Sequence, residues 1–374
     1  MFKHLIITAS LSLGISLCAF AQDPMSVERS RVLSQYGTAE TVQLTLPIGD
    51  GVGTVAKQDL KRQSASALRF HFVVSPPATE PNWGVEILDK KNKKVWSYSA
   101  AANPALDFWS DEIWDNTVQI QVFATVPVPT LRLTIDKIII SKEGTVIKSH
   151  TVNKLKSIDK APSAVQQWGH SVARLLFVAD GTNQQFLCTG FVVGWDLLLT
   201  NNHCIKTPSE MNSALVQFDY DKDGMQPVTL RFKELLMTNR DLDFTLLRLS
   251  TNSNRQVLNF DTSINENRPL VVIQHPAGRP KEFSIPNCQV LGMQVAGVSS
   301  ALTDFGHGCD TEGGSSGSPA LDLTTGRIVG LHHLGFLPNN KPVNRAVRSK
   351  QLWDFLTQNL NDAAARQAMG LPTQ

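Results

Sequence analysis

One short stretch of glycine and serine decides the fold prediction: Gly313-Gly314-Ser315-Ser316-Gly317-Ser318-Pro319. A serine hydroxyl is a weak nucleophile, and it needs a tight turn and a neighbouring base to react. The glycines around Ser316 allow such a turn and leave backbone N–H groups free to face an oxyanion. A flexible surface loop has the same composition. The stretch therefore predicts a nucleophile only if a base and an acid are found elsewhere in the chain.

Two further segments supply a candidate base and a candidate acid. His203 comes at the end of Leu197-Leu198-Leu199-Thr200-Asn201-Asn202-His203, where an apolar strand would hold a base firmly. Asp243 precedes Phe244-Thr245-Leu246-Leu247, and a carboxylate buried there needs a partner such as an imidazole N–H. Asp241 is a rival carboxylate two positions earlier. The order along the chain is histidine, aspartate, serine.

Together these segments resemble the chymotrypsin-fold serine peptidases, in which the triad has this order. The sequence is similar in particular to the bacterial V8-like (glutamyl endopeptidase) and lysyl-endopeptidase-like branch. The likeness covers roughly residues 165–360. It rests on Thr200-Asn201-Asn202-His203, Gly314-Ser315-Ser316-Gly317-Ser318-Pro319, Ile273-Gln274-His275-Pro276-Ala277-Gly278 and Asn344-Arg345-Ala346-Val347. Phe108-Trp109-Ser110 more loosely resembles the β-sandwich that precedes such peptidases.

The resemblance implies a role for each motif residue. Ser316 would be the nucleophile, His203 the general base and then acid, and Asp243 the group that fixes the imidazole tautomer. The family pattern, an aspartate followed by an apolar residue, a small residue and two leucines, selects Asp243 over Asp241. The backbone N–H groups of Gly314 and Ser316 would form the oxyanion hole. The substrate would be a protein or peptide, and no cofactor is implied.

The first 21 residues are typical of a secretory signal peptide. A positive start at Lys3 is followed by an apolar run over 5–20, and Ala19-Phe20-Ala21 offers small residues for cleavage before Gln22. The mature chain is therefore expected to be exported to the periplasm or beyond. No other apolar run is long enough to predict a membrane span.

Cleavage would remove Cys18 and leave Cys188, Cys204, Cys288 and Cys309. An even number of cysteines in an exported chain favours two disulfides, for which three pairings are possible. In the resembled family a bridge with the spacing of Cys188 and Cys204 ties down the histidine loop. This implies the pairs Cys188–Cys204 and Cys288–Cys309.

The pattern along the chain predicts an all-β protein. Residues 22–150 contain β-branched runs at 68–74, 83–88, 117–124 and 131–140, separated by turn residues, which indicates a β-sandwich. Residues 151–168 are polar and predict a linker. Residues 169–370 are expected to form the peptidase domain, a chymotrypsin-like double six-stranded β-barrel closed by one helix over 350–368.

Charge and metal-like motifs point to no further partner. The formal net charge of 374 residues is only +2, with charges of both signs interspersed, so neither nucleic acid nor an anionic membrane is expected. Asp219-Tyr220-Asp221-Lys222-Asp223-Gly224 imitates the start of a calcium loop, but its twelfth position, Leu230, lacks the required glutamate. The set of His307, Cys309, His332 and His333 matches no usual zinc spacing. We expect no metal, and nothing in the sequence indicates an oligomeric state.

Substrate choice depends on residues near the nucleophile, and here the resemblance points two ways. Asp310 occupies the place that binds lysine or arginine in trypsin-like enzymes. Thr311 and His332 instead match the residues by which V8-like enzymes hold a glutamate side chain. Asp310 facing the pocket would repel an acidic side chain, and a charged His332 would repel a basic one. We expect acidic P1 preference with His332 as an imidazolium, and basic preference stays open.

A different function is also open. The chain could be a secreted binding or adhesion protein built on an inactive protease-like barrel, with the sandwich as its working part. All three triad positions hold competent residues, which favours the peptidase.

Overall fold

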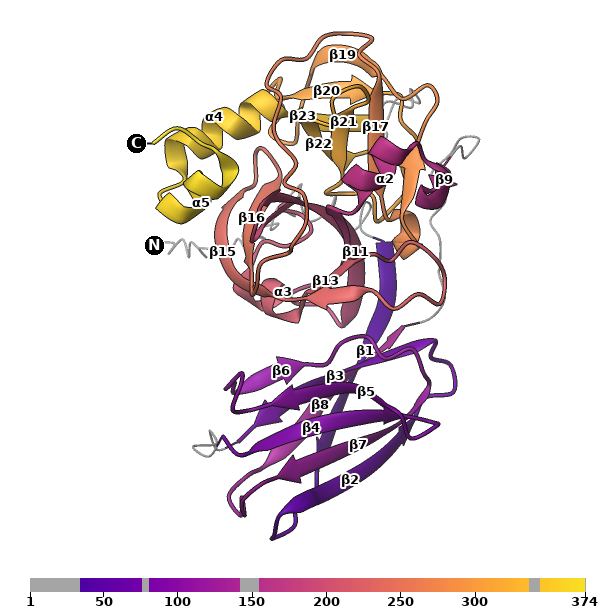
Figure 1. Cartoon of the computed structure of the whole chain (residues 1–374), viewed down its shortest axis with the longest axis vertical. Helices are drawn as coiled ribbons and strands as arrows, with labels where there is room; N and C mark the ends of the chain where they lie inside the picture. The colour runs from indigo at the N-terminus through magenta and orange to yellow at the C-terminus, as the bar shows by residue number, and fades with distance from the viewer. Residues whose placement is uncertain (1–33, 76–80, 142–154, 336–343, 374) are drawn as a thin grey trace, which may run out of the picture.

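The computed structural model describes residues 34–75, 81–141, 155–335 and 344–373. The predicted signal peptide, with its cleavage site, lies outside these ranges. Figure 1 shows a sandwich of strands joined to two further β units, with short helices at the C-terminal end of the chain. None of the described helices is both long and apolar enough to cross a membrane.

Two sheets packed face to face form the N-terminal sandwich. One has the order β1-β8-β3-β6 and the other the order β2-β7-β4-β5. In β7 every second residue is buried, as expected when alternate side chains of a strand face the opposing sheet. The strands are β1 (Ser34–Thr45), β2 (Gly53–Lys61), β3 (Ala67–Val74), β4 (Trp83–Asp89), β5 (Lys94–Ser99), β6 (Asp107–Trp109), β7 (Thr117–Ala124) and β8 (Leu133–Ser141).

The next strands close into a first barrel. β10 pairs with β11, β11 with β12, β12 with β16 and β16 with β15, while β10 pairs on its other side with β13 and β13 with β14. The ring closes because β14 runs almost directly into β15. Short helix α3 (Pro208–Ser213) precedes β13. The strands are β10 (Val172–Val178), β11 (Gln184–Gly194), β12 (Leu197–Thr200), β13 (Leu215–Phe218), β14 (Val228–Leu230), β15 (Phe232–Asn239) and β16 (Phe244–Leu249).

A second sheet, ordered β19-β20-β23-β22-β21-β17-β18-β9, forms the second barrel. Backbone hydrogen bonds from Leu270 to Cys288 and from Val290 to Arg268 join the start of β17 to the start of β19. Its strands are β9 (Leu155–Ser157), β17 (Leu270–Gln274), β18 (Glu282–Ser284), β19 (Val290–Val295), β20 (Asp304–His307), β21 (Pro319–Asp322), β22 (Ile328–Leu334) and β23 (Asn344–Arg348). The predicted chymotrypsin-like double barrel is confirmed.

The segment expected as a linker is more ordered than its polar sequence suggests. Its described part, from residue 155, contains β9, the 3-10 helix η1 (Ile158–Lys160) and the start of α2 (Ser163–Gly169). β9 adds to the second barrel beside β18. Ile158, Val165 and Trp168 are buried in the core between the two barrels. These apolar side chains provide the packing that keeps the segment in place.

The prediction of one C-terminal helix is wrong in one respect: two short helices are present, α4 (Ser349–Asn359) and α5 (Ala363–Met369). Leu360 has extended backbone angles and ends α4. Asp362 then caps α5, accepting a hydrogen bond from the Ala365 N–H at 2.7 Å. An aspartate favours this N-cap position over a helix interior.

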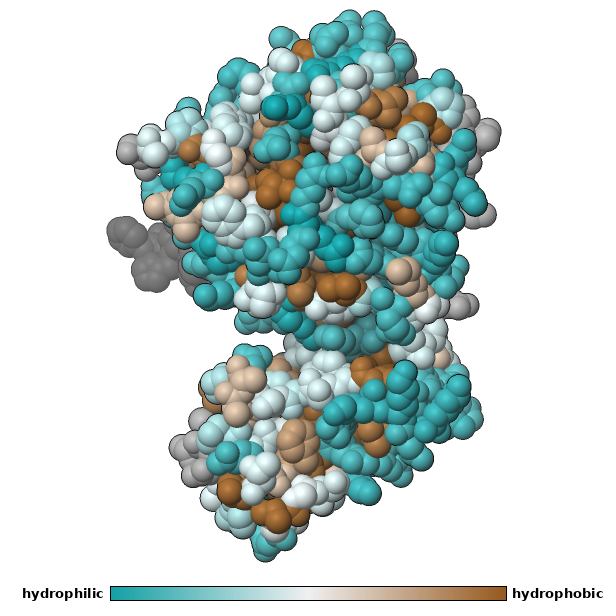
Figure 2. All heavy atoms as spheres, in the orientation of Figure 1, coloured by the Kyte–Doolittle hydropathy of each residue, from teal (hydrophilic) through white to brown (hydrophobic). Residues whose placement is uncertain are grey.

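Strand β1 links the sandwich to the first barrel. Its first half pairs with β11, and from Gly37 onward it pairs with β8 of the sandwich. Thr38 has partners on both sides, Gln184 in β11 and Ile140 in β8. Figure 2 shows that the two parts meet at a narrow waist.

Candidate active site

The pairing of β12 with β16 brings the candidate base and acid together. Thr200 lies opposite Thr245 in this ladder, so the residues that follow β12 approach those that precede β16. His203 Nδ1 lies 2.7 Å from Asp243 Oδ2, and the backbone N–H of His203 donates to Asp243 Oδ1 at 2.9 Å. Both residues are buried, His203 to 3% exposure and Asp243 completely. The Asp243 carboxylate therefore holds both the ring and the backbone of His203.

Asp243 is held in an unusual conformation in the turn before β16. Its φ is +44°, a region that few residues other than glycine adopt and that aspartate tolerates best. The side-chain amide of Asn201 donates to the Asp243 carbonyl at 2.9 Å and stabilises this turn. Burial alone would raise the pKa of Asp243, but His203 and His333 outweigh it and hold the pKa below its usual range. Asp241, the rival acid, is exposed in the same turn.

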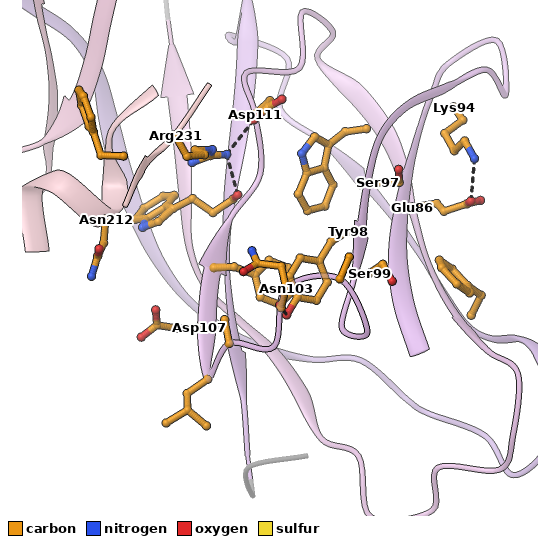
Figure 3. Close-up of a pocket in the computed structure, with 18 residues that line it drawn as sticks. Glu86, Lys94, Ser97, Tyr98, Ser99, Asn103, Asp107, Asp111, Asn212 and Arg231 are labelled. Atoms are coloured by element: carbon orange, nitrogen blue, oxygen red, sulfur yellow. Dashed lines mark hydrogen bonds and ion pairs between the residues drawn. The ribbon is translucent and has the colours of Figure 1, made fainter. Parts of the chain in front are cut away.

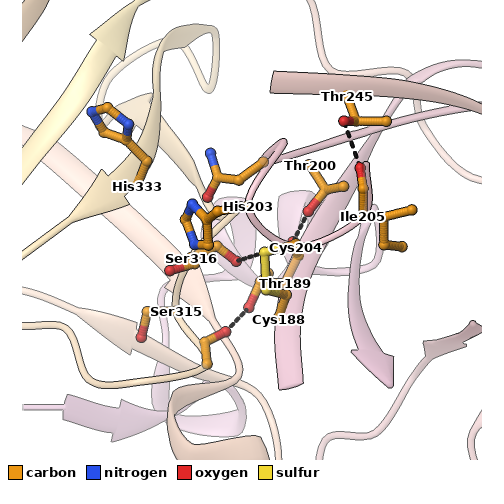
Figure 4. Close-up of a disulfide and its surroundings, with 12 residues drawn as sticks. Cys188, Thr189, Thr200, His203, Cys204, Ile205, Thr245, Ser315, Ser316 and His333 are labelled. Atoms are coloured by element: carbon orange, nitrogen blue, oxygen red, sulfur yellow. Dashed lines mark hydrogen bonds between the residues drawn. A yellow bond between two sulfur atoms is a disulfide. The ribbon is translucent and has the colours of Figure 1, made fainter. Parts of the chain in front are cut away.

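The glycine-rich turn that carries Ser316 lies between the two barrels. Ser316 accepts a hydrogen bond from the Thr189 N–H in β11, and Gly317 donates to the His332 carbonyl in β22. Gly317 has φ +86°, and a Cβ there would lie 2.0 Å from the Thr189 carbonyl oxygen. Only glycine fits this position. Figure 4 shows Ser316 beside His203.

One ring nitrogen of His203, which lies beside this turn, is not used by any hydrogen bond among the described residues. Nδ1 is occupied by Asp243, and Nε2 is buried without a hydrogen-bond partner in the described part of the chain. A buried polar atom without a partner is costly, and such atoms are common where a protein binds or reacts. The arrangement leaves one basic nitrogen available at the nucleophile turn.

Two backbone N–H groups of the turn face away from its supports. The Gly313 carbonyl accepts from the Ala277 N–H at 2.6 Å, and the Ser315 carbonyl accepts from the Ser318 N–H and hydroxyl. In a trans peptide the C=O and the following N–H point in opposite directions. The N–H groups of Gly314 and Ser316 therefore point away from these donors, and neither finds an acceptor among the described residues.

The turn also requires a glycine at position 314. Its φ is +96°, and a Cβ would lie 2.8 Å from the His275 carbonyl oxygen. The Thr189 hydroxyl donates to the Gly314 carbonyl at 2.9 Å and fixes the orientation of the turn. Residues 275–278 and strand β11 thus hold the turn in place through hydrogen bonds to its carbonyl groups.

The structure contains both expected disulfides. Cys188–Cys204 joins β11 to the residue next to His203, and Cys288–Cys309 joins the start of β19 to the segment before Asp310. Each therefore fastens one element of the site to its own barrel. Figure 4 shows the first bridge beside His203 and Ser316.

The three candidate pocket residues lie beside the nucleophile turn. Asp310 is half-buried, its N–H donates to the Ser284 hydroxyl, and its carbonyl accepts from the Gln274 side chain. Thr311 is buried next to it. His332, in β22, is buried, and its N–H donates to the Ser318 carbonyl. The residues that follow β22, 336–343, lie outside the described part of the chain.

The ring of His332 is neutral, contrary to the expected imidazolium. Burial, together with the nearby His307 and His333, lowers the pKa of His332 well below its ordinary value. Its Nδ1 lies 3.2 Å from His307 Nε2, so one neutral ring donates to the other. Burial also lowers the pKa of His307, to about 3.

Sequence reasoning missed two site residues, His333 and Asp304. His333 Nδ1 lies 3.1 Å from Asp243 Oδ2, and its Nε2 lies 2.7 Å from Asp304 Oδ2. Adjacent residues of a strand face opposite sides, so His332 and His333 cannot both line one pocket. That alternation was the available signal. Nothing in the sequence distinguished Asp304.

The segments that imitated metal sites are occupied by other contacts. Asp219 pairs with Arg255, and Asp221 pairs with the buried Lys281. Cys309 is in a disulfide. These acidic groups are directed at cationic side chains.

A large hollow lies away from the triad, between the sandwich and the first barrel. Its volume is about 850 Å³. Figure 3 shows Arg231, which lies between β14 and β15, on one side and Glu86 and Lys94 of the sandwich on the other, with Arg231 bound to Asp111 at 2.7 Å. None of His203, Asp243 and Ser316 lines this hollow. The candidate active site is therefore separate from it.

Residues 188–331 match the trypsin-like peptidase domain. This range includes the three candidate triad residues, and the match supports a serine peptidase hydrolase.

Two curated proteins are similar over about half of the chain. Secreted RxLR effector protein 73 of Plasmopara viticola is 29% identical over 192 residues, which are 46% of this chain and 46% of that protein. Uncharacterized protein y4fB of Sinorhizobium fredii is 30% identical over 203 residues, 49% of this chain and 29% of that protein. The chain thus spans less than half the length of either relative.

Solved structures with some similarity include two proteases. Rv3671c protease from M. tuberculosis, in its active form, has 16% identity and a TM-score of 0.43, covering 59% of this chain and 96% of that one. An HtrA-type protease with a tripeptide has 15% identity and a TM-score of 0.43, covering 53% of this chain and 62% of that one.

Proposed function

We propose that the chain is an exported serine endopeptidase with Ser316, His203 and Asp243 as its triad. The observation that carries the proposal is the imidazole of His203. Asp243 holds Nδ1 at 2.7 Å, Nε2 has no hydrogen-bond partner among the described residues, and Figure 4 shows the ring of His203 beside Ser316. Export is supported by the signal-like residues 1–21 and by the two disulfides.

The geometry supports a two-step hydrolysis. Ser316 Oγ attacks the carbonyl carbon of the scissile bond while His203 Nε2 takes its proton. The imidazolium then gives this proton to the leaving amine, and the amide bond breaks to leave an acyl group on Ser316. Water, deprotonated by His203, attacks the ester and releases the acid and the free serine. Asp243 keeps the Nδ1 proton and stabilises the imidazolium in both steps.

The N–H groups of Gly314 and Ser316 would bind the oxyanion of each tetrahedral intermediate. They already point away from the donors of Ala277 and Ser318 that hold the turn, and they have no acceptor of their own among the described residues. Donors that need no rearrangement are the most effective at stabilising charge that develops in the transition state.

For the residue before the scissile bond, we propose an acidic preference. In this proposal the Thr311 hydroxyl and the Nε2–H of a neutral His332 donate to the substrate carboxylate. This tautomer of His332 requires His307 Nε2, which lies 3.2 Å from His332 Nδ1, to be the donor of that pair. A hydroxyl and an imidazole N–H can hold a carboxylate without a buried positive charge. Because the ring is neutral, this preference does not weaken as pH rises from 6 to 8. Basic preference through Asp310 remains the competing proposal.

Fluorogenic peptides ending in Glu, Lys or Leu test both the proposed peptidase activity and the proposed preference for an acidic residue before the scissile bond. We expect cleavage after Glu to be fastest, His332→Ala to lose this lead, and Ser316→Ala to lose cleavage of all three. A clear lead for Lys that Asp310→Ser abolishes would replace the acidic pocket by a basic one. Equal, slow turnover by the wild type and Ser316→Ala would instead support the inactive binding protein.

A further inference from the structure

The catalytic carboxylate has a second histidine partner. His333, in β22, is completely buried and lies between two carboxylates, with Nδ1 3.1 Å from Asp243 Oδ2 and Nε2 2.7 Å from Asp304 Oδ2. His203 Nδ1 contacts the same oxygen of Asp243 at 2.7 Å. A continuous chain of contacts therefore runs from Asp304 through His333 and Asp243 to His203.

Hydrogen-bond chemistry assigns a charge to His333. A neutral imidazole carries one N–H, so one of its nitrogens would present a lone pair to a carboxylate oxygen. An imidazolium carries two N–H groups and satisfies both carboxylates at once. Burial by itself would lower the pKa of His333, but Asp304 and Asp243 outweigh it and raise the pKa to about 9.

The other titratable groups around His333 do not compensate its charge. His332, its neighbour in β22, and His307, in β20, are both neutral because burial lowers their pKa values. Arg345, in β23, adds positive charge near Asp304. Asp304 is the only carboxylate besides Asp243 in contact with the His333 ring among the described residues.

We propose that His333, as an imidazolium between Asp304 and Asp243, is a positioning residue of the triad and shifts the acid side of the pH–activity profile to lower pH. The inference rests on the proposed triad. The charged ring of His333 and the ring of His203 contact the same oxygen of Asp243, so the two rings compete for the negative charge of that carboxylate. Asp304 opposes this effect more weakly, because it binds the far edge of the ring.

The base of the triad must be neutral to take the proton of the nucleophile, and the acid limb of kcat/KM reports this requirement in the free enzyme. Removing the His333 charge should move this limb to higher pH, by about 0.5–1 pH unit. A His333→Gln variant retains an amide donor for Asp243 and removes the charge.

The matched control is His71→Gln. His71 also lies near two carboxylates, Asp136 at 2.6 Å and Asp107 at 3.9 Å, but in the sandwich. We expect its pH profile to coincide with that of the wild type. A His333→Gln enzyme that is active but has an unshifted acid limb would overturn the proposal, and so would an equal shift in His71→Gln.

A second measurement needs neither activity nor a His333 variant. In ¹⁵N-histidine-labelled protein carrying Ser316→Ala and His71→Gln, one ring should keep both nitrogens protonated at about pH 8. If every ring is neutral there, the charge assignment is wrong even when His333→Gln fails to fold. If this ring is found but the wild type hydrolyses no peptide, the proposed function fails and the charge assignment stands.

Discussion

The guanidinium of Arg174, in the first barrel, donates to the carboxylate of Glu112, in the sandwich, at 2.8 Å. Both side chains are fully enclosed, with 1% and 0% exposure. Arg174 also donates to Gln217 at 2.8 Å and lies 4.1 Å from the ring centre of Tyr220. The sandwich thus supplies the anion that neutralises a cation buried in the peptidase part.

This cation also reaches the support of the nucleophile turn. Arg174 donates to the Gly278 carbonyl at 3.0 Å, in the 3-10 helix η2 (Pro276–Gly278). The preceding residue, Ala277, donates to the Gly313 carbonyl at 2.6 Å. Three hydrogen bonds, Arg174–Glu112, Arg174–Gly278 and Ala277–Gly313, therefore connect the sandwich to the turn that carries Ser316.

Breaking this pair should be costly. Glu112→Ala leaves a buried cation without its anion, so we expect the free energy of unfolding to fall by about 3–5 kcal/mol. Urea unfolding of the mature chain measures this. The control is Glu86→Ala, which breaks the exposed pair with Lys94 and should cost no more than about 1 kcal/mol. Equal losses in the two variants would mean that the buried pair has no special role.

The two rival acids should differ sharply in their effect on hydrolysis. Asp243→Asn retains the shape of the side chain but favours the wrong imidazole tautomer, and kcat should fall by about 10⁴. Asp241→Asn changes an exposed carboxylate in the same turn and should leave kcat within about a factor of three. Steady-state kinetics with one peptide compare them. A larger loss of kcat in Asp241→Asn than in Asp243→Asn would show that Asp241 is the acid of the triad.

Local patterns predicted the strands and the three triad motifs, because these depend on nearby residues. The runs at 68–74 and 117–124 correspond to β3 and β7, and the motifs place His203 after β12 and Ser316 on a glycine turn. The sequence did not predict that β1 would join a strand of the first barrel and a strand of the sandwich in one continuous sheet, because that depends on pairing with strands about 100 and 150 residues away.

Buried polar contacts between distant segments were also beyond sequence reasoning. Glu112 and Asp304 are ordinary acidic residues in the sequence, and their roles arise from Arg174 and His333, which approach them only in the folded chain. Burial likewise changed the expected charge of His332. Residue type alone does not fix a protonation state.

The two disulfides should have different kinetic effects. Replacing Cys188 and Cys204 by alanine should cost about 2–4 kcal/mol and lower kcat for all peptides alike, because the bridge holds the residue next to His203. Replacing Cys288 and Cys309 should mainly change KM and the preference among P1 residues, since Cys309 precedes Asp310. Kinetics with Glu, Lys and Leu peptides separate the two outcomes. If loss of the first bridge changed the P1 preference and loss of the second lowered kcat for all peptides alike, the bridges would support other elements than those proposed.

Acid should destabilise the fold through its buried neutral histidines. The pKa of His307 is lowered by burial to about 3, while an unfolded chain binds this proton near the ordinary value of 6.5. Between these values the unfolded state holds more protons, so stability falls as pH falls. His307→Gln should weaken the pH dependence of urea unfolding between about pH 4 and 6.5 by about one proton. An unchanged dependence would contradict the assignment of a neutral buried His307.

His333 should change the pH dependence of stability in the opposite direction, stabilising the fold more in acid than in alkali. Its pKa is raised to about 9 by the two carboxylates, so its contribution to stability is fully present below about pH 6.5 and is lost as pH rises through 9. The loss of stability in His333→Gln, measured by urea unfolding, should therefore be largest in acid and shrink at alkaline pH. A constant difference across this range would mean that His333 does not change charge there.

The central claim is that Ser316 is the nucleophile, and stoichiometric phosphorylation by an organophosphate tests it most directly. Diisopropyl fluorophosphate reacts with a serine activated by a neighbouring base. Peptide mapping by mass spectrometry should place one adduct per chain on Ser316, and the rate of peptide hydrolysis should fall in proportion to the labelled fraction. Asp243→Asn should slow the labelling, and Ser316→Ala should take up no label. Full hydrolysis by chains labelled at Ser316, or an adduct on another serine that accompanies the loss of activity, would contradict the account.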